Sequence, residues 1–352
     1  GNMANMVCAF SALRAAAPWD VRGAGVAGAD HPRLVMYATG ETHTWVDKFA
    51  DLSGLGTQAI NRIPTDEQGR MRVSALRAAI VADKKAGAVP AFVIGSAGTV
   101  STGAIDPLDE LAELCTELGL WLHVDGAYGA PAAALPDAPA ALAAMSLAHS
   151  IAMDPHKWLY APLEAGCVLV RDPEALRKTF SFSPPYYHFE GSADDPPTNF
   201  FEWGPQNSRG FRALKVWLAM RQAGREGIVA SIAADIALAR RMYDRVTEYA
   251  ELEALTCGLS ITTFRYVPAE LRDRAEKADV RSYLNELNEA VLTAVQQSGE
   301  AYPSNAVIDG KYAIRACIVN FRTTAADADA LPEIVVRLGR TVHARMRSSL
   351  ES

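Results

Sequence analysis

The chain has 352 residues, which is enough for two packed domains of ordinary size, and 49% of them are apolar. Its formal net charge is −7, and no basic stripe or polybasic tail interrupts the mixture of acidic and basic residues. This pattern argues against a nucleic-acid partner. No apolar run approaches the roughly 20 residues that a membrane-spanning helix needs, so the sequence also argues against a membrane protein.

The five cysteines are odd in number, scattered along the chain and mostly set in apolar segments. This usage favours reduced, buried thiols and a cytoplasmic setting. No pair of cysteines has the spacing of zinc ligands, so we expect no metal site.

Short apolar runs alternate with longer helical stretches from residue 34 onward. Each run is bounded by glycine, proline or polar residues, which is typical of strands buried on both faces of a parallel or mixed sheet. The predicted strands are 34–38, 91–95, 121–124, 150–153 and 166–170.

The clearest helix is predicted to begin at Asp106-Pro107 and to end at Gly119. Asp106 can cap free N–H groups, Pro107 suits the first helical position, and Gly119 is a typical C-terminal stop. Strand, helix and strand in this order form a βαβ unit, which predicts a three-layer α/β fold.

A proline-rich stretch at 183–199 is predicted to be a long irregular loop. After it, the order of predicted helices and strands differs from that of the first half of the chain. Two helices are predicted next, at 206–223 and 225–249. A strand near 260–266, a helix near 280–297, a strand near 312–321 and a helix from about 328 then follow. We therefore predict a large domain at 1–222 and a small C-terminal α+β domain at 223–352.

Lys157 lies just past a predicted buried strand, between His156 and Trp158. A lysine ordinarily prefers a solvated face, but its amine can form a Schiff base with an aldehyde cofactor when neighbouring groups lower its pKa. On this context alone, an ordinary surface turn explains the segment equally well.

Asp125 ends a nearly apolar strand within the string HVDGAYG at 123–129. The carboxyl end of such a strand is where α/β folds bind ligands. A buried carboxylate needs a cationic partner, which a protonated pyridine nitrogen could supply. The alternative is a carboxylate that caps the next helix.

Three further segments are weaker signals when they are taken singly. His43 lies in a loop after the first predicted strand, where a histidine is more often structural than catalytic. Thr99 lies in a run of small and hydroxylated residues that also fits an ordinary polar turn. Gly1–Asn5 opens like a glycine-led helix start, whose free N–H groups can hold a phosphate.

Taken together and in this order, these segments resemble the group II pyridoxal-phosphate decarboxylases, the family of aromatic-amino-acid and glutamate decarboxylases. The resemblance covers nearly the whole chain. It rests on the strings HVDGAYG and DPHKW, with support from FEWGPQ at 201–206, SRGFRALKVW at 208–217 and RACIVNFRTT at 315–324. It implies the type I aminotransferase fold, a pyridoxal 5'-phosphate cofactor, an amino-acid substrate and a homodimer with sites at the interface.

The resemblance also implies a role for each residue around the cofactor ring. Lys157 would form the Schiff base, and Asp125 would pair with the ring nitrogen and keep it protonated. His43 would stack on one ring face, Ala127 would pack against the other, and His156 would tune the lysine.

A second group of residues is expected around the phosphate and the ring substituents. Asn2 and Met3, with Asp154 and Ser208, would line the phosphate pocket, although a carboxylate such as Asp154 repels a phosphate and could instead orient nearby N–H groups. Thr99 would lie close to the ring or its phenolic oxygen.

The reaction implied by the resemblance is decarboxylation of an L-amino acid to the amine and carbon dioxide, with an aromatic amino acid as the candidate substrate. A tyrosine on a mobile loop would return a proton to Cα, and Tyr186 is the matching residue, with Tyr187 the other candidate. The structural alternative is a tyrosine that anchors a proline-rich turn. Related enzymes that make aldehydes differ at the stacking histidine or at this tyrosine, and both positions here match decarboxylases.

Relative to the family, the sequence begins within a motif, after the N-terminal arm that interlocks with the partner subunit. We therefore expect that the sequence is a fragment, that its start is misassigned, or that the arm was lost. Arg209-Gly210 also stands where a pair of arginines is more usual. Two alternatives therefore stay open. The chain could be a non-catalytic remnant of the fold, or it could be an aldehyde synthase or another type I lyase.

Overall fold

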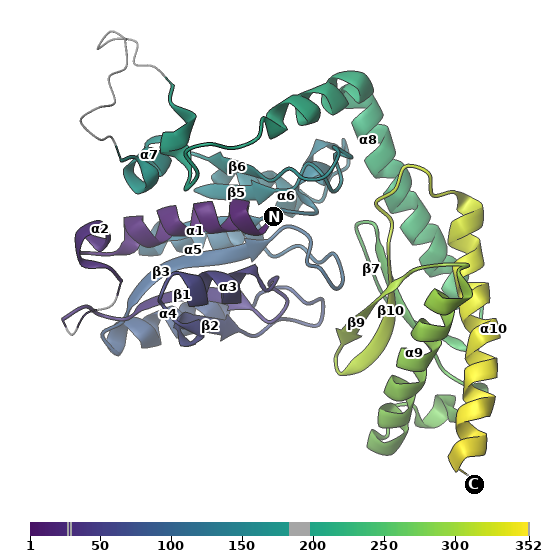
Figure 1. Cartoon of the computed structure of the whole chain (residues 1–352). Coiled ribbons are helices and arrows are strands. Elements are labelled where there is room, and N and C mark those ends of the chain that lie inside the picture. The colour runs from purple at the N-terminus through teal and green to yellow at the C-terminus, as the bar shows by residue number, and fades with distance from the viewer. Residues whose placement is uncertain (27, 29, 183–197, 351–352) are drawn as a thin grey trace. The chain divides into compact units, whose positions relative to one another are not determined.

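The computed structural model describes the whole chain except residues 27, 29, 183–197 and 351–352, and the side chains of 348–350. The described chain forms two compact units (Figure 1). The large unit consists of Gly1–Ala97, Ile105–Ala133 and Asp137–Gln222, and the small unit consists of the other described residues, including those from Ala223 onward.

A six-stranded mixed sheet in the order β2-β1-β3-β4-β5-β6 forms the middle of the large unit. Neighbouring strands run parallel except for β6, which is antiparallel to β5. Both β1 and β3 are buried almost throughout, as the continuous apolar runs predicted. The strands are β1 Leu34–Thr39, β2 Ile60–Ile63, β3 Val89–Ser96, β4 Trp121–Asp125, β5 Ser150–Met153 and β6 Cys167–Val170.

Helices cover this sheet in two layers. Helix α1 packs on β3 to β6 and also touches α3 and α7, whereas α4 and α5 contact β2 to β4 and each other. The α/β class with three layers is therefore confirmed for the large unit. The helices of four or more residues are α1 Asn2–Ala16, α2 Val21–Ala24, α3 Trp45–Leu52, α4 Val73–Lys85, α5 Leu108–Leu118, α6 Ala140–Ala143 and α7 Glu174–Phe180.

The start of α5 differs from the prediction. Asp106 does not cap this helix, which has Pro107 at its N-cap and no side-chain capping bond. Instead, the buried carboxylate accepts the backbone N–H groups of Met71 and Ser96, each at 2.7 Å. Two backbone donors from other segments thus compete successfully for the carboxylate, and burial raises the pKa of Asp106 to about 6. The predicted stop at Gly119 is confirmed, with φ 67°.

The helix that follows the undescribed segment begins later than predicted, at Arg212 rather than at residue 206. The preceding Gly210 is a poor helix former. Helix α8 (Arg212–Thr247) is interrupted at Gly224, whose φ of 67° and ψ of 172° are not helical. This interruption separates the two helices that the sequence predicted.

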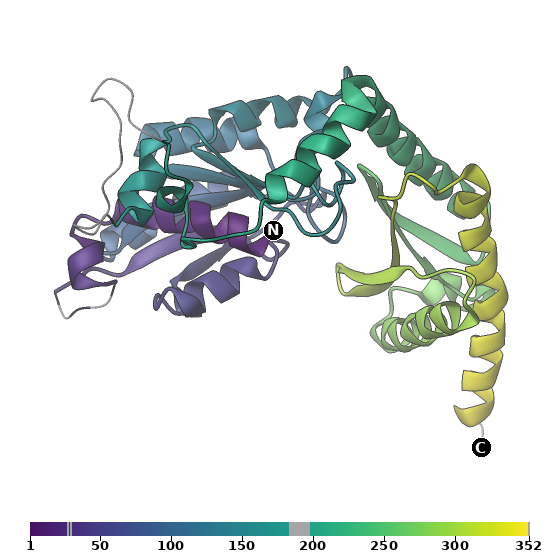
Figure 2. The same cartoon turned by 45° about the horizontal axis from the view of Figure 1, so that its top comes forward.

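The small unit contains a four-stranded antiparallel sheet in the order β7-β8-β10-β9. Its core is formed by buried residues of β8, β10, α9, α10 and the second part of α8. Figure 2 shows the ribbons of these elements in green and yellow. The bounds are β7 Leu252–Gly258, β8 Ile261–Tyr266, α9 Ala278–Ser298, β9 Ser304–Ile308, β10 Lys311–Cys317 and α10 Ala325–Leu350. In the described part of the chain, no helix is long and apolar enough to cross a membrane.

Candidate active site

Three of the predicted site residues follow parallel strands at the same edge of the large sheet. Asp125 is the last residue of β4, Lys157 comes shortly after β5, and His43 follows β1. Strand β4 lies beside β5, with Asp125 opposite Ala152. Because parallel strands end at a common edge, the topology gathers residues from distant parts of the sequence where α/β folds bind ligands.

The carboxylate of Asp125 is held by two neutral donors, one on each oxygen. The indole N–H of Trp45 donates to Oδ2 at 2.8 Å, and the backbone N–H of Ala127 donates to Oδ1 at 3.1 Å. Among the residues that the structure describes, no cationic side chain forms an ion pair with this half-buried carboxylate. The Asp125 anion is thus fixed in orientation without being neutralised.

The amine of Lys157 is paired with the other site carboxylate. Its Nζ lies 3.2 Å from Oδ2 of Asp154, whose side chain is almost completely buried. A tight turn creates this contact, because the backbone N–H of Lys157 donates to the carbonyl of Asp154 at 2.9 Å. The backbone N–H of Asp154 in turn donates to the carbonyl of Ala127. Ala127 therefore connects the two carboxylate-bearing segments.

His156 and His43 are the two histidines closest to these charged groups among the predicted site residues. Nε2 of His156 is 3.9 Å from Oδ2 of Asp154, and its Nδ1 lies 2.6 Å from the carbonyl oxygen of Ala165. Partial desolvation lowers the pKa of His43 below its ordinary value; Asp125 opposes this shift and Lys157 adds to it. His43 is thus close enough to Asp125 and Lys157 to interact electrostatically with both.

The N-terminus of α1 contacts the residue that directly follows β5. The backbone nitrogen of Gly1 lies 2.6 Å from Oδ1 of Asp154. The N–H groups of Asn2 and Met3 belong to the first turn of the helix, where backbone donors have no partner within the helix. Such donors can hold an anion.

One turn further along α1, Asn5 is hydrogen-bonded to the buried His123 of β4 (Oδ1 to Nε2, 2.8 Å). Nδ1 of His123 lies 2.9 Å from the hydroxyl oxygen of Ser150. Complete burial lowers the pKa of His123 to about 4, so the ring is neutral near pH 7 and does not compete for the charge of Asp125. This network ties the start of α1 to the strand that carries Asp125.

The remaining predicted residues are not joined to this cluster by hydrogen bonds in the described structure. Ser208 is exposed in the segment before α8. Thr99 belongs to the small unit, where its hydroxyl oxygen lies 3.0 Å from that of Thr102 and accepts the N–H of Ala104. Tyr186 and Tyr187 lie outside the described residues.

Sequence reasoning missed Trp45 and the role of His123. The two bonds of Trp45, to His43 and to Asp125, carry no signature in a single sequence. His123 could have been noticed, because a histidine two residues before Asp125 on the same strand faces the same side of the sheet.

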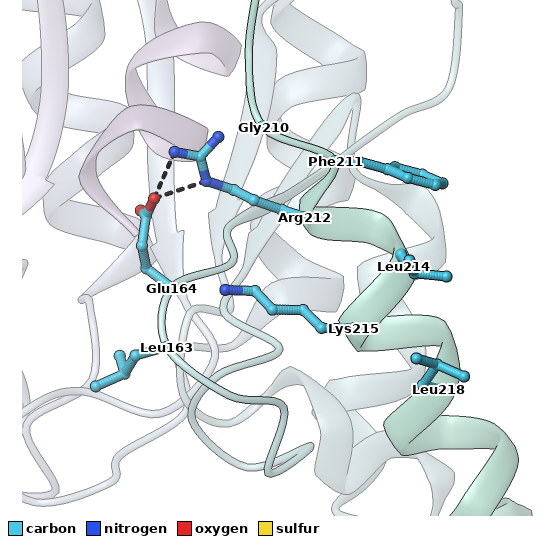
Figure 3. A pocket seen from close by; sticks show the side chains of 8 residues that line it. All are labelled: Leu163, Glu164, Gly210, Phe211, Arg212, Leu214, Lys215 and Leu218. Carbon is cyan, nitrogen blue, oxygen red and sulfur yellow. Dashed lines mark hydrogen bonds and ion pairs between the residues drawn. The ribbon is translucent and has the colours of Figure 1, made fainter.

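A surface hollow in the large unit lies apart from these residues. It is formed by the 163–164 turn and the beginning of α8, where Arg212 reaches across to Glu164 at 2.6 Å (Figure 3). Lys215 points toward the same carboxylate, whereas Phe211 points away from it (Figure 3). None of the predicted site residues lines this hollow.

Residues 1–267 match a family model described as the pyridoxal-dependent decarboxylase conserved domain. An aromatic-L-amino-acid decarboxylase of Bacillus atrophaeus is 37% identical over 328 residues, which make up 93% of this chain and 65% of the relative. A phenylacetaldehyde synthase of Petunia hybrida is 32% identical over 286 residues, or 80% of this chain and 56% of the relative. The chain thus spans less than two thirds of the length of these curated relatives.

Solved structures show the same architecture. Mouse CSAD in apo form superimposes with a TM-score of 0.88 at 27% identity, covering 96% of this chain and 70% of the mouse chain. Oryza sativa TDC with PLP and tryptamine superimposes with a TM-score of 0.86 at 27% identity, covering 97% of this chain and 69% of the rice chain. These likenesses confirm the fold that the sequence motifs implied.

Proposed function

Because this chain belongs to the pyridoxal-dependent decarboxylase family, we propose that its protein removes the α-carboxylate of an L-amino acid as carbon dioxide and releases the amine. The observation that carries the proposal is the placement of an amine, Lys157, and a fixed carboxylate, Asp125, after neighbouring parallel strands. We also propose that residues 1–222 form the cofactor-binding domain and 223–352 a small C-terminal domain.

The residues at this edge fit pyridoxal 5'-phosphate. Asp125 keeps its negative charge between two neutral donors, so it can accept a bond from a cationic ring nitrogen. The N–H groups at the start of α1 suit an anionic phosphate. The Lys157 side chain is 39% exposed, which leaves its amine accessible to an aldehyde.

The cofactor, when bound, supplies an aldehyde that captures amines and a cationic ring that withdraws electrons from the bond to be broken. Lys157 would hold it through Nζ, and Asp125 would keep the proton on its ring nitrogen. His43 would cover one ring face and Ala127 the other, where a larger side chain would clash. Asp154 holds the lysine amine in place before the cofactor binds.

We propose Asn2, Met3 and Ser208 as phosphate contacts, Thr99 as a neighbour of the ring, and His156 as the residue that tunes Lys157. Tyr186, or its neighbour Tyr187, is the proposed donor of the proton to Cα.

We propose an aromatic L-amino acid as the substrate. Support comes from the Bacillus atrophaeus relative, whose name specifies aromatic amino acids, and from a Camptotheca acuminata relative named tryptophan decarboxylase, which is 32% identical. Both proteins are longer than this chain, so this specificity is inferred for the complete protein. We further propose a cytoplasmic homodimer with its active sites at the subunit interface.

An aldehyde synthase is the competing activity, because the Petunia hybrida relative and a Rhodiola rosea 4-hydroxyphenylacetaldehyde synthase resemble the chain. His43 and Tyr186 favour the amine product, since both match the decarboxylase pattern. A non-catalytic remnant is the other alternative.

A panel of L-amino acids, assayed for carbon dioxide, amine and aldehyde in the presence of pyridoxal phosphate, tests the proposal. We expect carbon dioxide and amine in equal amounts with an aromatic substrate. Aldehyde with ammonia would favour the synthase, and no turnover with any amino acid would favour the remnant.

A further inference from the structure

Trp45 connects two residues of the proposed site. It is fully buried as the first residue of α3. Its indole N–H donates to Oδ2 of Asp125 at 2.8 Å, and its backbone N–H donates to Nδ1 of His43 at 3.1 Å. We propose that Trp45 is a positioning residue, which orients the Asp125 carboxylate toward the ring nitrogen of pyridoxal phosphate; this inference rests on the proposed function.

The neutrality of the indole is the central feature of this inference. A hydrogen bond to a carboxylate is stronger than one between neutral groups. An arginine or lysine at position 45 would also neutralise Asp125 and compete with a cationic ring N–H. The indole fixes the carboxylate plane and leaves the full negative charge available. The N–H of Ala127 on the other oxygen acts in the same way.

The packing around Trp45 keeps the indole N–H in place. The indole and the ring of His123 are nearly perpendicular, with centroids 5.7 Å apart and planes at 89°, and the ring centroid of Phe49 lies 6.4 Å from that of the indole. His123 is two residues before Asp125 on β4 and is neutral near pH 7 because burial lowers its pKa to about 4. The indole is fully buried in this packing, and the His123 ring beside it is uncharged near pH 7, so that ring does not attract the carboxylate.

The backbone of Trp45 positions His43 at the same time. The first N–H of a helix has no partner within the helix, and here Nδ1 of His43 accepts it. In the neutral imidazole the ring proton is then on Nε2. A single residue thus fixes the orientation of the proposed ring-stacking histidine and that of the proposed ring-nitrogen partner.

The test compares the affinity of two variants for pyridoxal phosphate and for an analogue in which a C–H group replaces the ring nitrogen. Trp45→Phe keeps the aromatic packing and removes the N–H donor. Trp121→Phe is the matched control, because it removes an indole N–H bond of equal length, 2.8 Å, to the neutral hydroxyl of Ser150. We expect Trp45→Phe to weaken pyridoxal phosphate binding about tenfold, with no change for the analogue. Trp121→Phe should change neither affinity.

Two results would overturn the inference: an unchanged affinity of Trp45→Phe for pyridoxal phosphate, or an equal loss for both ligands, which would indicate a merely structural role. If Trp45→Phe does not fold, site-specific replacement of Trp45 by its benzothienyl isostere, which differs only in lacking the N–H, gives the same comparison. Failure of the unaltered chain to bind pyridoxal phosphate would instead count against the proposed function.

Discussion

The Nζ of Lys157 lies 3.2 Å from the carboxylate of Asp154, a side chain that is almost entirely buried. A buried carboxylate without a cation is costly, so this lysine stabilises the cofactor-free fold in addition to its proposed chemistry. The pair gives the first prediction. Lys157→Ala should lower the free energy of unfolding of the cofactor-free chain by about 1–2 kcal/mol, a modest value because the lysine is partly solvated.

The control for that prediction is a double-mutant cycle. In an Asp154→Asn background the same lysine substitution should have little effect, because no buried charge is left behind. Denaturant unfolding of the four proteins measures the coupling. Equal losses in both backgrounds would show that the ion pair is not the cause.

The buried His123 predicts a loss of stability in acid. Its pKa is about 4 in the folded chain and about 6.5 when unfolded, so between these values the unfolded state binds the extra proton. Stability should therefore fall by about 3 kcal/mol as the pH drops from about 6.5 to about 4. His123→Gln should flatten the unfolding free energy across this range.

The matched control for this pH dependence is His149→Gln, at a half-buried histidine whose pKa is lowered chiefly by burial. This substitution should reduce the pH dependence of the unfolding free energy much less than His123→Gln does. Asp106 acts in the opposite direction, because its pKa is raised to about 6 by burial and its stabilising effect is lost as pH rises. Because Asp106 is present in every protein compared, its contribution cancels when the unfolding free energy of each variant is subtracted from that of the unaltered chain. An unchanged slope in His123→Gln would contradict the assignment.

Alanine substitutions at Gly103 and Gly87 distinguish the cost of backbone strain from the cost of steric overlap. Both have positive φ, 74° and 81°, but a Cβ at Gly103 would lie 2.3 Å from the carbonyl oxygen of Gly258, whereas nothing lies within 4 Å of one at Gly87. Gly87→Ala should cost about 1 kcal/mol of unfolding free energy from strain alone. Gly103→Ala should cost at least about 3 kcal/mol, because the backbone must also move. Equal losses would contradict the close approach.

Tyr186→Phe should change the products of the reaction rather than the capture of substrate. If this tyrosine returns the proton to Cα, its loss should let dissolved O2 accept two electrons instead, so that aldehyde, ammonia and hydrogen peroxide increase at the expense of amine. Tyr187→Phe is the adjacent control, and the product ratio is read by chromatography. A changed product ratio in Tyr187→Phe alone would assign the proton donation to Tyr187. Unchanged product ratios in both variants would show that neither tyrosine donates the proton.

The sequence predicted most of the large sheet because its central strands β1 and β3 are buried almost throughout, which leaves continuous apolar runs. Strand β2, Ile60–Ile63, was missed because two of its four residues are polar. Strand β10 was predicted near 312–321, but its hairpin partner β9 was missed, although the turn between them carries Asp309-Gly310, both with positive φ, and this dipeptide favours tight hairpins.

The residues of the candidate site that lie in local sequence motifs could be predicted from the sequence. Lys157 and Asp125 each follow an apolar run, and the order of parallel strands brings those runs side by side. Trp45 could not be predicted, because its partner Asp125 is 80 residues away and an indole donor has no pattern of spacing. Asp106 was misassigned because a helix-start motif does not reveal whether backbone donors from other segments are nearer.

The most direct test of the account is to locate the covalent attachment. The chain is incubated with pyridoxal phosphate, reduced with borohydride, digested and analysed by mass spectrometry, with Lys157→Ala as the control. We expect one reduced cofactor adduct on the peptide that contains Lys157 and none in the variant. An adduct spread over surface lysines, or one that persists at equal yield in Lys157→Ala, would contradict the central claim.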